Sequence, residues 1–383
     1  LSMTPEDLAA RWLADVGQPP VPLPVYVDHL AEEVIGLDVQ EHADLHALLD
    51  RGTAPAGELS GLRRGFPSIR FESHAAVLPP GLVNAHAHLE LSALRGQVPG
   101  GRGFVPWVDG LVQARTRITP DVEAESIDAA VSELLSLGVV ALGDVTNRLS
   151  ALPALASVPI VTCVFHEVFG LRKDTAEVML GMAKQTRAEV PEWPRHLRYA
   201  LSPHTPYTLH PEVLQSILDA VRTDGARTSM HLAEHSAERA YLTTGKGALA
   251  DWYVARGASE LDWQAPGCDA ITYAERLGAL APDVIAVHLC DARPDEIERV
   301  VRAGSPVVLC PRSNLYIELK LPPLLDLLRA GITHGLGSDS LASNTSLDPL
   351  AEARSLAQRF PSVPARTLLA MATSYGANAL GVD

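Results

Sequence analysis

Cysteine is scarce in this sequence of 383 residues, and no two cysteines form a C-x-x-C pair. The four are scattered along the chain: Cys163, Cys268, Cys290 and Cys310. This spacing argues against a disulfide framework and predicts reduced, mostly buried thiols in a cytoplasmic protein.

Basic residues are outnumbered, because 31 Lys and Arg against 46 Asp and Glu give a net charge of −15. An acidic surface repels nucleic acid and anionic membranes, so neither is expected as a partner. No apolar run approaches the length of a membrane span. Residues 1–7 lack the basic and apolar regions of a secretory signal, so none is expected. Lysine itself is rare, with Lys173, Lys184, Lys246 and Lys320 as the full set.

The composition does provide for a core, with 47% hydrophobic and 20% charged residues. From residue 80 onward, short apolar segments alternate with amphipathic segments of helical period. We expect strands at 83–88, 139–144, 160–166, 197–204, 228–234, 284–289, 307–310 and 332–339, each followed by a helix. Strands that alternate with helices form a parallel sheet, and eight such units predict an α/β fold of the (β/α)8 TIM barrel type.

The chain before this alternation has a different pattern. A proline-rich stretch at 19–24 separates short candidate elements, namely strands at 25–27 and 69–71 and a helix at 41–49. We therefore predict an accessory N-terminal segment over residues 1–78 and a barrel domain over residues 79–383.

Two histidines stand at the end of the first predicted strand. His86 and His88 are separated by one residue, so their side chains project to the same face of a strand. Two convergent imidazoles are half of a zinc-type site, but two surface histidines near a turn have the same spacing. Other strand ends decide between these interpretations, because the chemistry of a barrel lies at the carboxyl ends of its strands.

Four further predicted strands end in residues that can bind a metal or transfer a proton. They are His204 on the fourth strand, His231 with Glu234 on the fifth, His288 on the sixth and Asp339 on the eighth. Each alone has a structural alternative: a loop cap for His204, a satisfied core histidine for His288 and a helix cap for Asp339. Together they indicate an active site.

The order of these motifs resembles the amidohydrolase superfamily of metal-dependent hydrolases and deaminases, and most of all its aminohydrolase and chlorohydrolase subgroup. The similarity runs from Leu78 to Leu380 and rests on His86-Ala87-His88, Ser202-Pro203-His204-Thr205-Pro206-Tyr207, His231-Leu232-Ala233-Glu234, His288, Cys310-Pro311-Arg312-Ser313-Asn314 and Gly337-Ser338-Asp339-Ser340. The resemblance implies a small accessory layer, β-sandwich-like, built from both ends of the chain. Because the sequence stops at Asp383, we expect that layer to be partly incomplete.

By this resemblance, His86, His88, His231 and Asp339 hold one divalent metal ion. Three neutral imidazoles and a carboxylate suit Zn²⁺, with Fe²⁺ or Mn²⁺ as alternatives. Such a metal lowers the pKa of a bound water and supplies hydroxide near neutral pH. Two-metal members of the superfamily bridge their metals with a modified lysine on the fourth strand. None of the four lysines falls at a predicted strand end, which predicts a single metal.

The resemblance also implies catalytic roles. Asp339 would accept the proton of the water, Glu234 would protonate a ring nitrogen and then the leaving group, and His288 would orient the hydroxide or stabilise the intermediate. Glu234 favours deamination of a ring amine with release of ammonia, because displacing an aromatic amino group requires a protonated ring nitrogen. The alternatives are a chlorohydrolase or amide-bond hydrolase of a heterocycle, and a catalytically silent barrel acting as a binding protein.

The candidate substrate-binding residues are Glu90, Trp107, His204 and Asn314. Glu90 could bind ribose hydroxyls or lie exposed on a loop. Trp107, like Phe104, could contact the substrate ring or pack a helix on the barrel. His204 would face the substrate, and Asn314 could contact it or shape the loop after the seventh strand.

Leu89-Glu90-Leu91-Ser92, the segment 103–107 and residues 231–234 together resemble 6-aminodeoxyfutalosine deaminases of menaquinone biosynthesis. This implies a small heterocyclic substrate, an adenine nucleoside that carries a benzoate, with adenosine and S-adenosylhomocysteine types as alternatives. Arg148 and Arg312 could receive its carboxylate. A homodimer is a further expectation, and His166-Glu167 at the end of the third strand is given no role.

Overall fold

A computed structural model of the protein describes residues 81–190, 192–257 and 264–382. The predicted accessory segment over 1–78, with its candidate strands and helix, lies outside these ranges, so its boundary and the β-sandwich-like layer remain predictions. Among the described helices, none has both the length and the apolar character that crossing a membrane requires.

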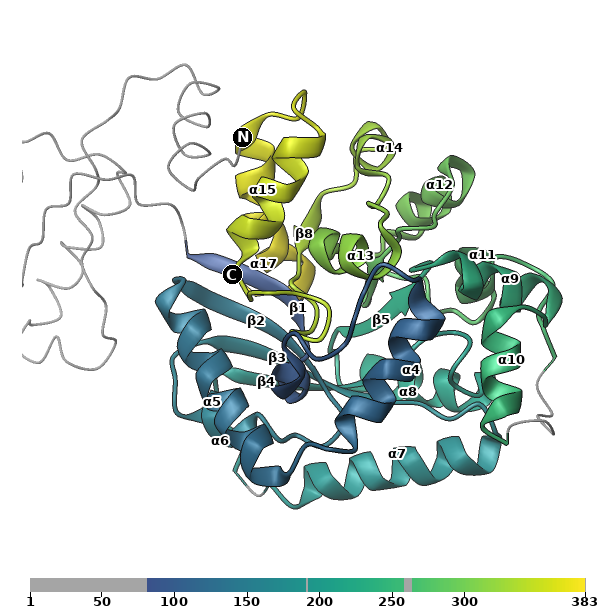
Figure 1. The fold of residues 1–383 in the computed structure, drawn as a ribbon, viewed down its shortest axis with the longest axis horizontal. Helices are drawn as coiled ribbons and strands as arrows, with labels where there is room; N and C mark the ends of the chain where they lie inside the picture. Colours follow the sequence, from purple (N-terminus) through teal and green to yellow (C-terminus); the bar gives the residue numbers. More distant parts are fainter. Residues whose placement is uncertain (1–80, 191, 258–263, 383) are drawn as a thin grey trace, which may run out of the picture. The chain divides into compact units, whose positions relative to one another are not determined.

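The eight predicted strands are confirmed, and they form two parallel four-stranded sheets (Figure 1). One sheet has the order β1-β2-β3-β4 and the other the order β5-β6-β7-β8. Their bounds are β1 Leu82–Ala87, β2 Val139–Thr146, β3 Val161–Val168, β4 Leu197–Pro203, β5 Thr228–Leu232, β6 Val284–His288, β7 Val307–Leu309 and β8 His334–Leu336.

Backbone hydrogen bonds join the two sheets at both of their edges. The N–H of His231 on β5 donates to the carbonyl oxygen of His204, directly after β4, at 3.0 Å. On the other side, the N–H of Asp339 after β8 donates to the carbonyl oxygen of His86 on β1, also at 3.0 Å. The strands therefore have the arrangement of a TIM-barrel-like α/β fold, as predicted.

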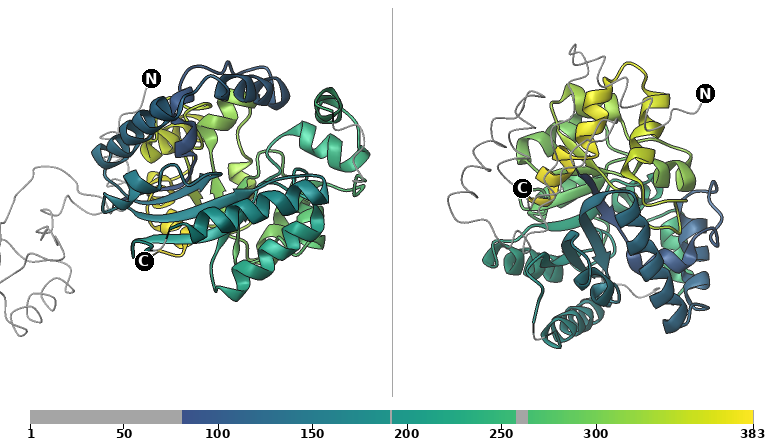
Figure 2. Two further views of the ribbon diagram at one scale, coloured as in Figure 1. Left: turned by 90° about the horizontal axis from the view of Figure 1, so that it is seen from below. Right: turned by 90° about the vertical axis from the view of Figure 1, so that its left-hand side faces the viewer.

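Helices surround the strands, and α7 runs along the lower edge of the view in Figure 1 (see also Figure 2). Proline stands in the first turn of α5, α8, α12, α13 and α15, where its missing N–H leaves no intrahelical hydrogen bond unmade. The helices are η1 Leu89–Leu94 (a 3₁₀ helix), α4 Phe104–Arg115, α5 Pro120–Ser136, α6 Leu152–Ala156, α7 Lys173–Ala188, α8 Pro211–Thr223, α9 Ser236–Thr244, α10 Ala248–Ala255, α11 Ala270–Arg276, α12 Pro294–Ala303, α13 Pro311–Glu318, α14 Leu324–Arg329, α15 Pro349–Arg359, α16 Ala365–Met371 and α17 Ser374–Leu380.

Five of these helices, η1, α11, α13, α16 and α17, were not predicted. The loop expected after the seventh strand is helix α13, whose buried residues include the polar Ser313 and Asn314, so its apolar period is broken. Helix α17 contains Gly376, a residue that disfavours helices, but a Cβ there would lie 2.9 Å from a methyl carbon of Val83. Close packing on β1 requires this glycine. Because glycine has a low helix propensity, the sequence did not predict a helix here.

A buried apolar cluster links the two sheets to the C-terminal helix. Val145 and Phe165 come from the first sheet, Ile285 and Val287 from the second, and Leu380 from α17. Burying one such side chain contributes about 1.5–3 kcal/mol relative to leaving it exposed. The strands are thereby fixed as a rigid scaffold for the residues at their carboxyl ends.

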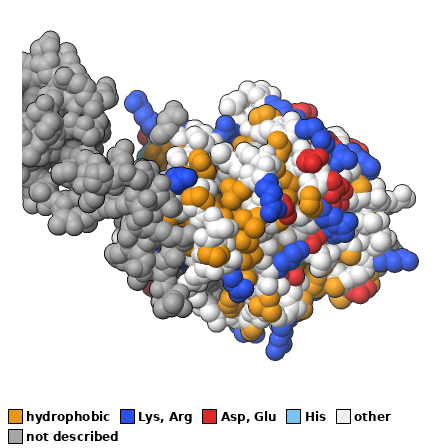
Figure 3. Space-filling view, turned by 90° about the horizontal axis from the view of Figure 1, so that it is seen from above, with side chains coloured by type: hydrophobic (Ala, Val, Ile, Leu, Met, Phe, Trp, Pro, Cys, Tyr) orange, Lys and Arg blue, Asp and Glu red, His pale blue; other side chains and the backbone are white. Residues whose placement is uncertain are grey.

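Charges of both signs are interspersed on the face drawn in Figure 3, with apolar side chains between them. Ion pairs join neighbouring segments of the surface. Arg222 Nε lies 2.9 Å from Asp283 Oδ2, and Arg299 Nη1 lies 2.5 Å from Glu275 Oε2. Each exposed pair contributes little to stability, on the order of 0–1 kcal/mol.

His334 at the start of β8 predicts a pH-dependent stability. Its side chain is fully buried, and Nδ1 lies 3.0 Å from the Ile332 carbonyl oxygen. Nε2 has no hydrogen-bond partner among the described residues. Burial lowers the pKa of His334 from 6.5 to about 4. The unfolded chain therefore binds the extra proton, and this contribution to stability is present above pH 6.5 and is lost as the pH falls toward 4.

Replacing His334 by Leu should remove this pH-dependent contribution to the free energy of unfolding. Chemical denaturation should show that the free energy of unfolding falls by about 2 kcal/mol more in the natural protein than in the variant between about pH 7 and pH 5. Equal pH slopes for the two proteins would contradict the assignment.

Candidate metal centre

The predicted ligands come together at the carboxyl ends of strands from both sheets. His86 is on β1 and His88 directly follows it, His231 is on β5, and Asp339 follows β8. A Cβ on Gly337 would lie 2.6 Å from the Cβ of His86, so only glycine allows β8 to approach β1 this closely. The segment that carries Asp339 is thus held against the strand that carries His86 by close backbone packing.

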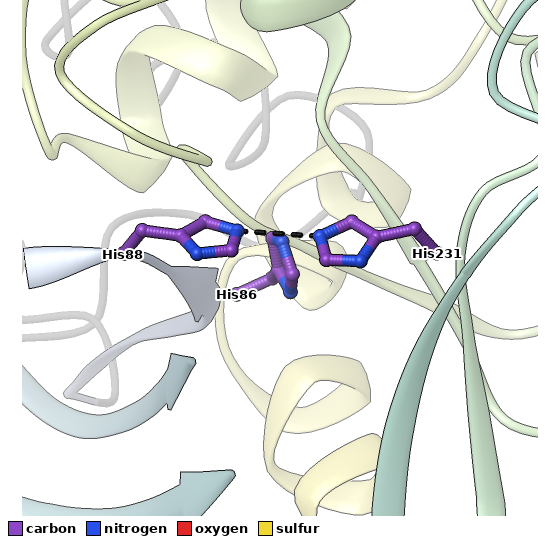
Figure 4. Close-up of side chains that lie close together, drawn as sticks. All are labelled: His86, His88 and His231. Carbon is purple, nitrogen blue, oxygen red and sulfur yellow. Dashed lines mark hydrogen bonds between the residues drawn. The ribbon is translucent and has the colours of Figure 1, made fainter. Parts of the chain in front are cut away.

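Three imidazoles face one another at this point (Figure 4). The Nε2 atoms of His88 and His231 lie 3.2 Å apart, with the two rings nearly parallel at 13°. The His86 ring stands across them, at 84° to His88 and 85° to His231. One potential ligand nitrogen from each ring lies within 4.8 Å of the others.

Asp339 adds a carboxylate oxygen to this group. Its Oδ1 lies 3.5 Å from His88 Nε2 and 3.9 Å from His86 Nε2. Its other oxygen, Oδ2, accepts a hydrogen bond from the Ser313 hydroxyl at 2.5 Å. The two oxygens therefore have different surroundings: Oδ1 faces the imidazoles, and Oδ2 is hydrogen-bonded to Ser313 of α13.

These residues fit a divalent metal ion. His86 is fully buried, and neither of its ring nitrogens has a hydrogen-bond partner. Burial, followed by the neighbouring histidines, lowers its pKa well below the ordinary value, which keeps the imidazole neutral as a ligand must be. Two nitrogens that bind one tetrahedral zinc are about 3.4 Å apart, close to the separation of His88 and His231.

The backbone at these strand ends adopts conformations that side chains rarely allow. Ala233, His288 and Asp339 all have positive φ, at 49°, 80° and 57°. The Glu238 carboxylate accepts hydrogen bonds from the N–H groups of Ala233 at 3.1 Å and Glu234 at 2.7 Å. Such strain is typical of functional sites, where surrounding contacts hold it in place.

Glu234 and His288 lie beside Asp339, with one ligand atom from each within 4.8 Å of the others. Glu234 Oε1 is 3.7 Å from His288 Nε2. Burial raises the pKa of Glu234 well above the ordinary value, and the Asp339 charge adds to this. Burial lowers the pKa of His288 to about 3. Burial thus favours the uncharged form of both side chains.

Asn314 fixes the tautomer of that imidazole. Its side-chain nitrogen lies 3.4 Å from His288 Nδ1. An amide N–H that donates to Nδ1 leaves the ring proton on Nε2, facing Glu234. Asn314 is fully buried in α13, so its observed contact is with His288, and substrate contact stays a prediction.

Glu167 at the end of β3 belongs to the same group, although the sequence suggested no role for it. Its Oε1 lies 3.5 Å from His231 Nδ1 and 4.0 Å from His204 Nε2, while Oε2 accepts from the Asn147 amide at 3.1 Å. Burial opposes ionisation, yet the neighbouring histidines and the amide hold the pKa of Glu167 below its ordinary value. The sequence signal that could have assigned Glu167 to the site is its position at the end of the third predicted strand.

Two other candidate substrate contacts have internal partners. The Glu90 carboxylate is buried and accepts from the backbone N–H groups of Asn147 at 3.1 Å and Arg148 at 2.8 Å. Trp107 is buried in an apolar cluster, and its Nε1 lies 3.4 Å from the Ala342 carbonyl oxygen. Trp107 therefore packs its helix as the structural alternative expected, whereas Glu90 is buried in η1 and does not lie exposed on a loop. The roles of both residues in binding substrate stay predictions.

The arginines considered for a substrate carboxylate are also engaged. Arg148 donates from Nη2 to both oxygens of Glu123, at 2.6 and 2.8 Å. Arg312 donates to the hydroxyls of Ser346 at 2.9 Å and Thr345 at 2.5 Å. His204 is the most accessible of the predicted contacts, with a side chain 31% exposed.

Solved structures share this fold. An aminofutalosine deaminase from Helicobacter pylori, in complex with methylthio-coformycin, superposes with a TM-score of 0.70 at 24% identity, covering 79% of this chain and 74% of the other. An adenosine deaminase from Xanthomonas campestris with bound zinc gives a TM-score of 0.65 at 24% identity, covering 79% and 67%.

Two relatives show the similarity in sequence. An aminodeoxyfutalosine deaminase from Deinococcus radiodurans is 32% identical over 86% of this chain and 79% of its own length. A 5-methylthioadenosine/S-adenosylhomocysteine deaminase from Nitratidesulfovibrio vulgaris is 28% identical over 80% of this chain and 67% of its own. Residues 77–383 match the profile of the amidohydrolase family. The protein is thus a hydrolase that belongs to the amidohydrolase family, as its motifs predicted.

Proposed function

We propose that the protein catalyses the hydrolytic deamination of a 6-aminopurine nucleoside, with 6-aminodeoxyfutalosine as the first candidate. The observation that carries the proposal is the buried pair of Glu234 and His288 next to Asp339. A carboxyl group whose pKa is raised, beside a carboxylate whose pKa is lowered, can act as the acid and the base that this reaction needs. The deaminase relatives support the same reaction class.

The residues that would hold the metal are His86, His88, His231 and Asp339. We propose zinc, because neutral imidazoles and one carboxylate are its preferred ligands, with Fe²⁺ and Mn²⁺ as alternatives. When bound, the ion supplies Lewis-acid activation of a water at neutral pH. One ring nitrogen of His86, which has no hydrogen-bond partner among the described residues, would then serve as a ligand.

The protein groups then divide the proton transfers between them. Asp339 Oδ1 accepts the proton that the attacking water loses, and Ser313 keeps the carboxylate in place through Oδ2. Glu234 donates a proton to the ring nitrogen next to the attacked carbon, recovers one from the hydroxyl group that has added to the ring, and passes it to the amine, which leaves as ammonia. The proton held by Asp339 then restores the acid form of Glu234. The Nε2–H of His288 donates a hydrogen bond to the oxygen that adds to the ring.

Two phenylalanines contact histidines that belong to these strand ends. Phe104 at the start of α4 stacks on His235, with ring centroids 3.8 Å apart. Phe169 after β3 is 40% exposed, and its ring lies 6.3 Å from that of His204. Apolar and aromatic walls with a few polar groups are typical of pockets for heterocycles. A cytoplasmic location and a homodimer stay predictions.

The substrate class is tested by ammonia release and loss of adenine absorbance. We expect turnover of aminopurine nucleosides, with the highest kcat/KM for 6-aminodeoxyfutalosine among that compound, adenosine, 5-methylthioadenosine and S-adenosylhomocysteine. A 6-chloropurine nucleoside and a heterocyclic amide serve as comparison substrates. Preferred release of chloride or cleavage of the amide would assign one of the alternative reactions, and binding without any turnover would assign a silent barrel.

A further inference from the structure

We propose that Glu167 is a positioning residue of the metal centre: it places a second negative charge behind His231 and thereby sets how tightly the centre holds its divalent ion. The inference rests on the metal site of the proposed function and not on the identity of the substrate. It gives a role to a carboxylate that neither of the two proton transfers uses.

The geometry places Glu167 on the far side of a ligand imidazole. His231 Nδ1 donates to the His204 carbonyl oxygen at 3.0 Å, which leaves the lone pair of His231 on Nε2, the atom that faces His88. Glu167 Oε1 lies 3.5 Å from the same Nδ1. The His204 carbonyl oxygen holds the orientation of the ring, and the negative charge of a carboxylate at this distance makes the imidazole a stronger ligand.

The surroundings of the Glu167 carboxylate favour a cation nearby. Glu167 is 7% exposed, and its Oε1 has no hydrogen-bond partner among the described residues. Burying a charged oxygen without such a partner is energetically unfavourable. Within the described residues, its ion-pair partners are His204 and His231, with no lysine or arginine among them.

Charge balance completes the argument. Neutral imidazoles and the single charge of Asp339 leave a divalent ion with one positive charge. The carboxylate of Glu167 brings the total to zero inside a buried site, where an uncompensated charge is strongly unfavourable. The protein thus carries one more negative charge than its ligands supply, at the place where the ion needs it.

Glu167→Gln tests this charge, because it keeps the shape of the side chain and an oxygen to accept from Asn147. Zinc binding to the full-length protein, measured against a competing chelator, should weaken about 10- to 100-fold. The melting temperature of the metal-free protein should fall less on this substitution than that of the zinc-loaded protein, because the ion is the main partner of the charge. The zinc-loaded variant should melt lower than the natural protein. The KM for the nucleoside, with saturating zinc, should stay the same.

Glu123→Gln is the matched control. Glu123 is also 7% exposed, but its carboxylate pairs with Arg148 at 2.6 Å instead of with histidines. Its loss should lower the melting temperature with and without zinc and leave zinc affinity unchanged. A residue of purely structural value behaves in this way, so the loss of zinc affinity and the zinc-dependent loss of stability expected for Glu167→Gln separate the two cases.

Unchanged zinc affinity in Glu167→Gln would overturn the proposal, and so would a rise in KM at unchanged zinc affinity, which would make Glu167 a substrate contact. If this variant does not fold, Glu167→Met removes the same charge while keeping most of the side-chain volume. It should also weaken zinc binding, and wild-type affinity there would equally overturn the proposal. Because zinc binding is measured without substrate, failure here is distinct from failure of the proposed reaction.

Discussion

Replacing Glu234 by Gln is expected to lower kcat by about 10²- to 10⁴-fold, the usual contribution of a general acid and base. The glutamine has nearly the same size but cannot give a proton to a ring nitrogen or to the departing amine. Steady-state ammonia release at saturating nucleoside measures the loss. The variant should remain folded, since the glutamate makes no ion pair with lysine or arginine among the described residues.

Metal content distinguishes this loss from damage to the site. The Glu234→Gln protein should bind as much metal as the natural protein, and its KM should change little, because the defect lies in proton transfer. Activity within a few-fold of the natural protein would remove Glu234 from the mechanism. Loss of the metal along with activity would show that the substitution had disturbed the ligands instead.

Replacing His86 by Ala should abolish tight metal binding and reduce kcat/KM by at least about 10⁴-fold. A Lewis acid contributes several kcal/mol to the barrier, and each 1.36 kcal/mol is a factor of about ten in rate. Metal analysis should find one equivalent per chain in the natural protein and none in the variant. Two tightly bound equivalents in the natural protein would contradict the single-metal prediction.

His196→Ala is a suitable control for this experiment. His196 is partly buried and its Nε2 lies 3.1 Å from the Leu155 carbonyl oxygen, remote in the fold from the strand ends that carry the ligands. Its loss should leave metal content and turnover unchanged. Retention of the metal by His86→Ala would place the ion elsewhere in the protein.

The parts that the sequence predicted are those with a periodic or positional signal. Alternating apolar segments located all eight strands, and the rule that barrel chemistry gathers at the carboxyl strand ends placed the histidines, Glu234 and Asp339 in one site. The resemblance to the amidohydrolase superfamily then selected His86, His88, His231 and Asp339 as the ligands. The structure brings these side chains within a few ångströms of one another, as that rule requires.

The parts that the sequence missed depend on contacts between distant segments. Glu90 and Glu167 both lie close to a histidine in sequence, yet the first is bound to the backbone after β2 and the second lies beside His231. Nothing in their local sequence separates them. The positive φ of Ala233 and Asp339 was equally hidden, because neither residue is glycine and only surrounding hydrogen bonds support that conformation.

The distribution of the ligands over the two sheets has a consequence for stability. His86 and His88 belong to the half of the ring that begins with β1, whereas His231 and Asp339 belong to the half that begins with β5. An ion bound to all four would be a cross-link between half-barrels otherwise joined at their edges by few backbone hydrogen bonds. At a free concentration 1,000 times its Kd, such an ion stabilises the folded state by about 4 kcal/mol. The supply of metal in the cell would then control how much of the protein is folded as well as how much is active.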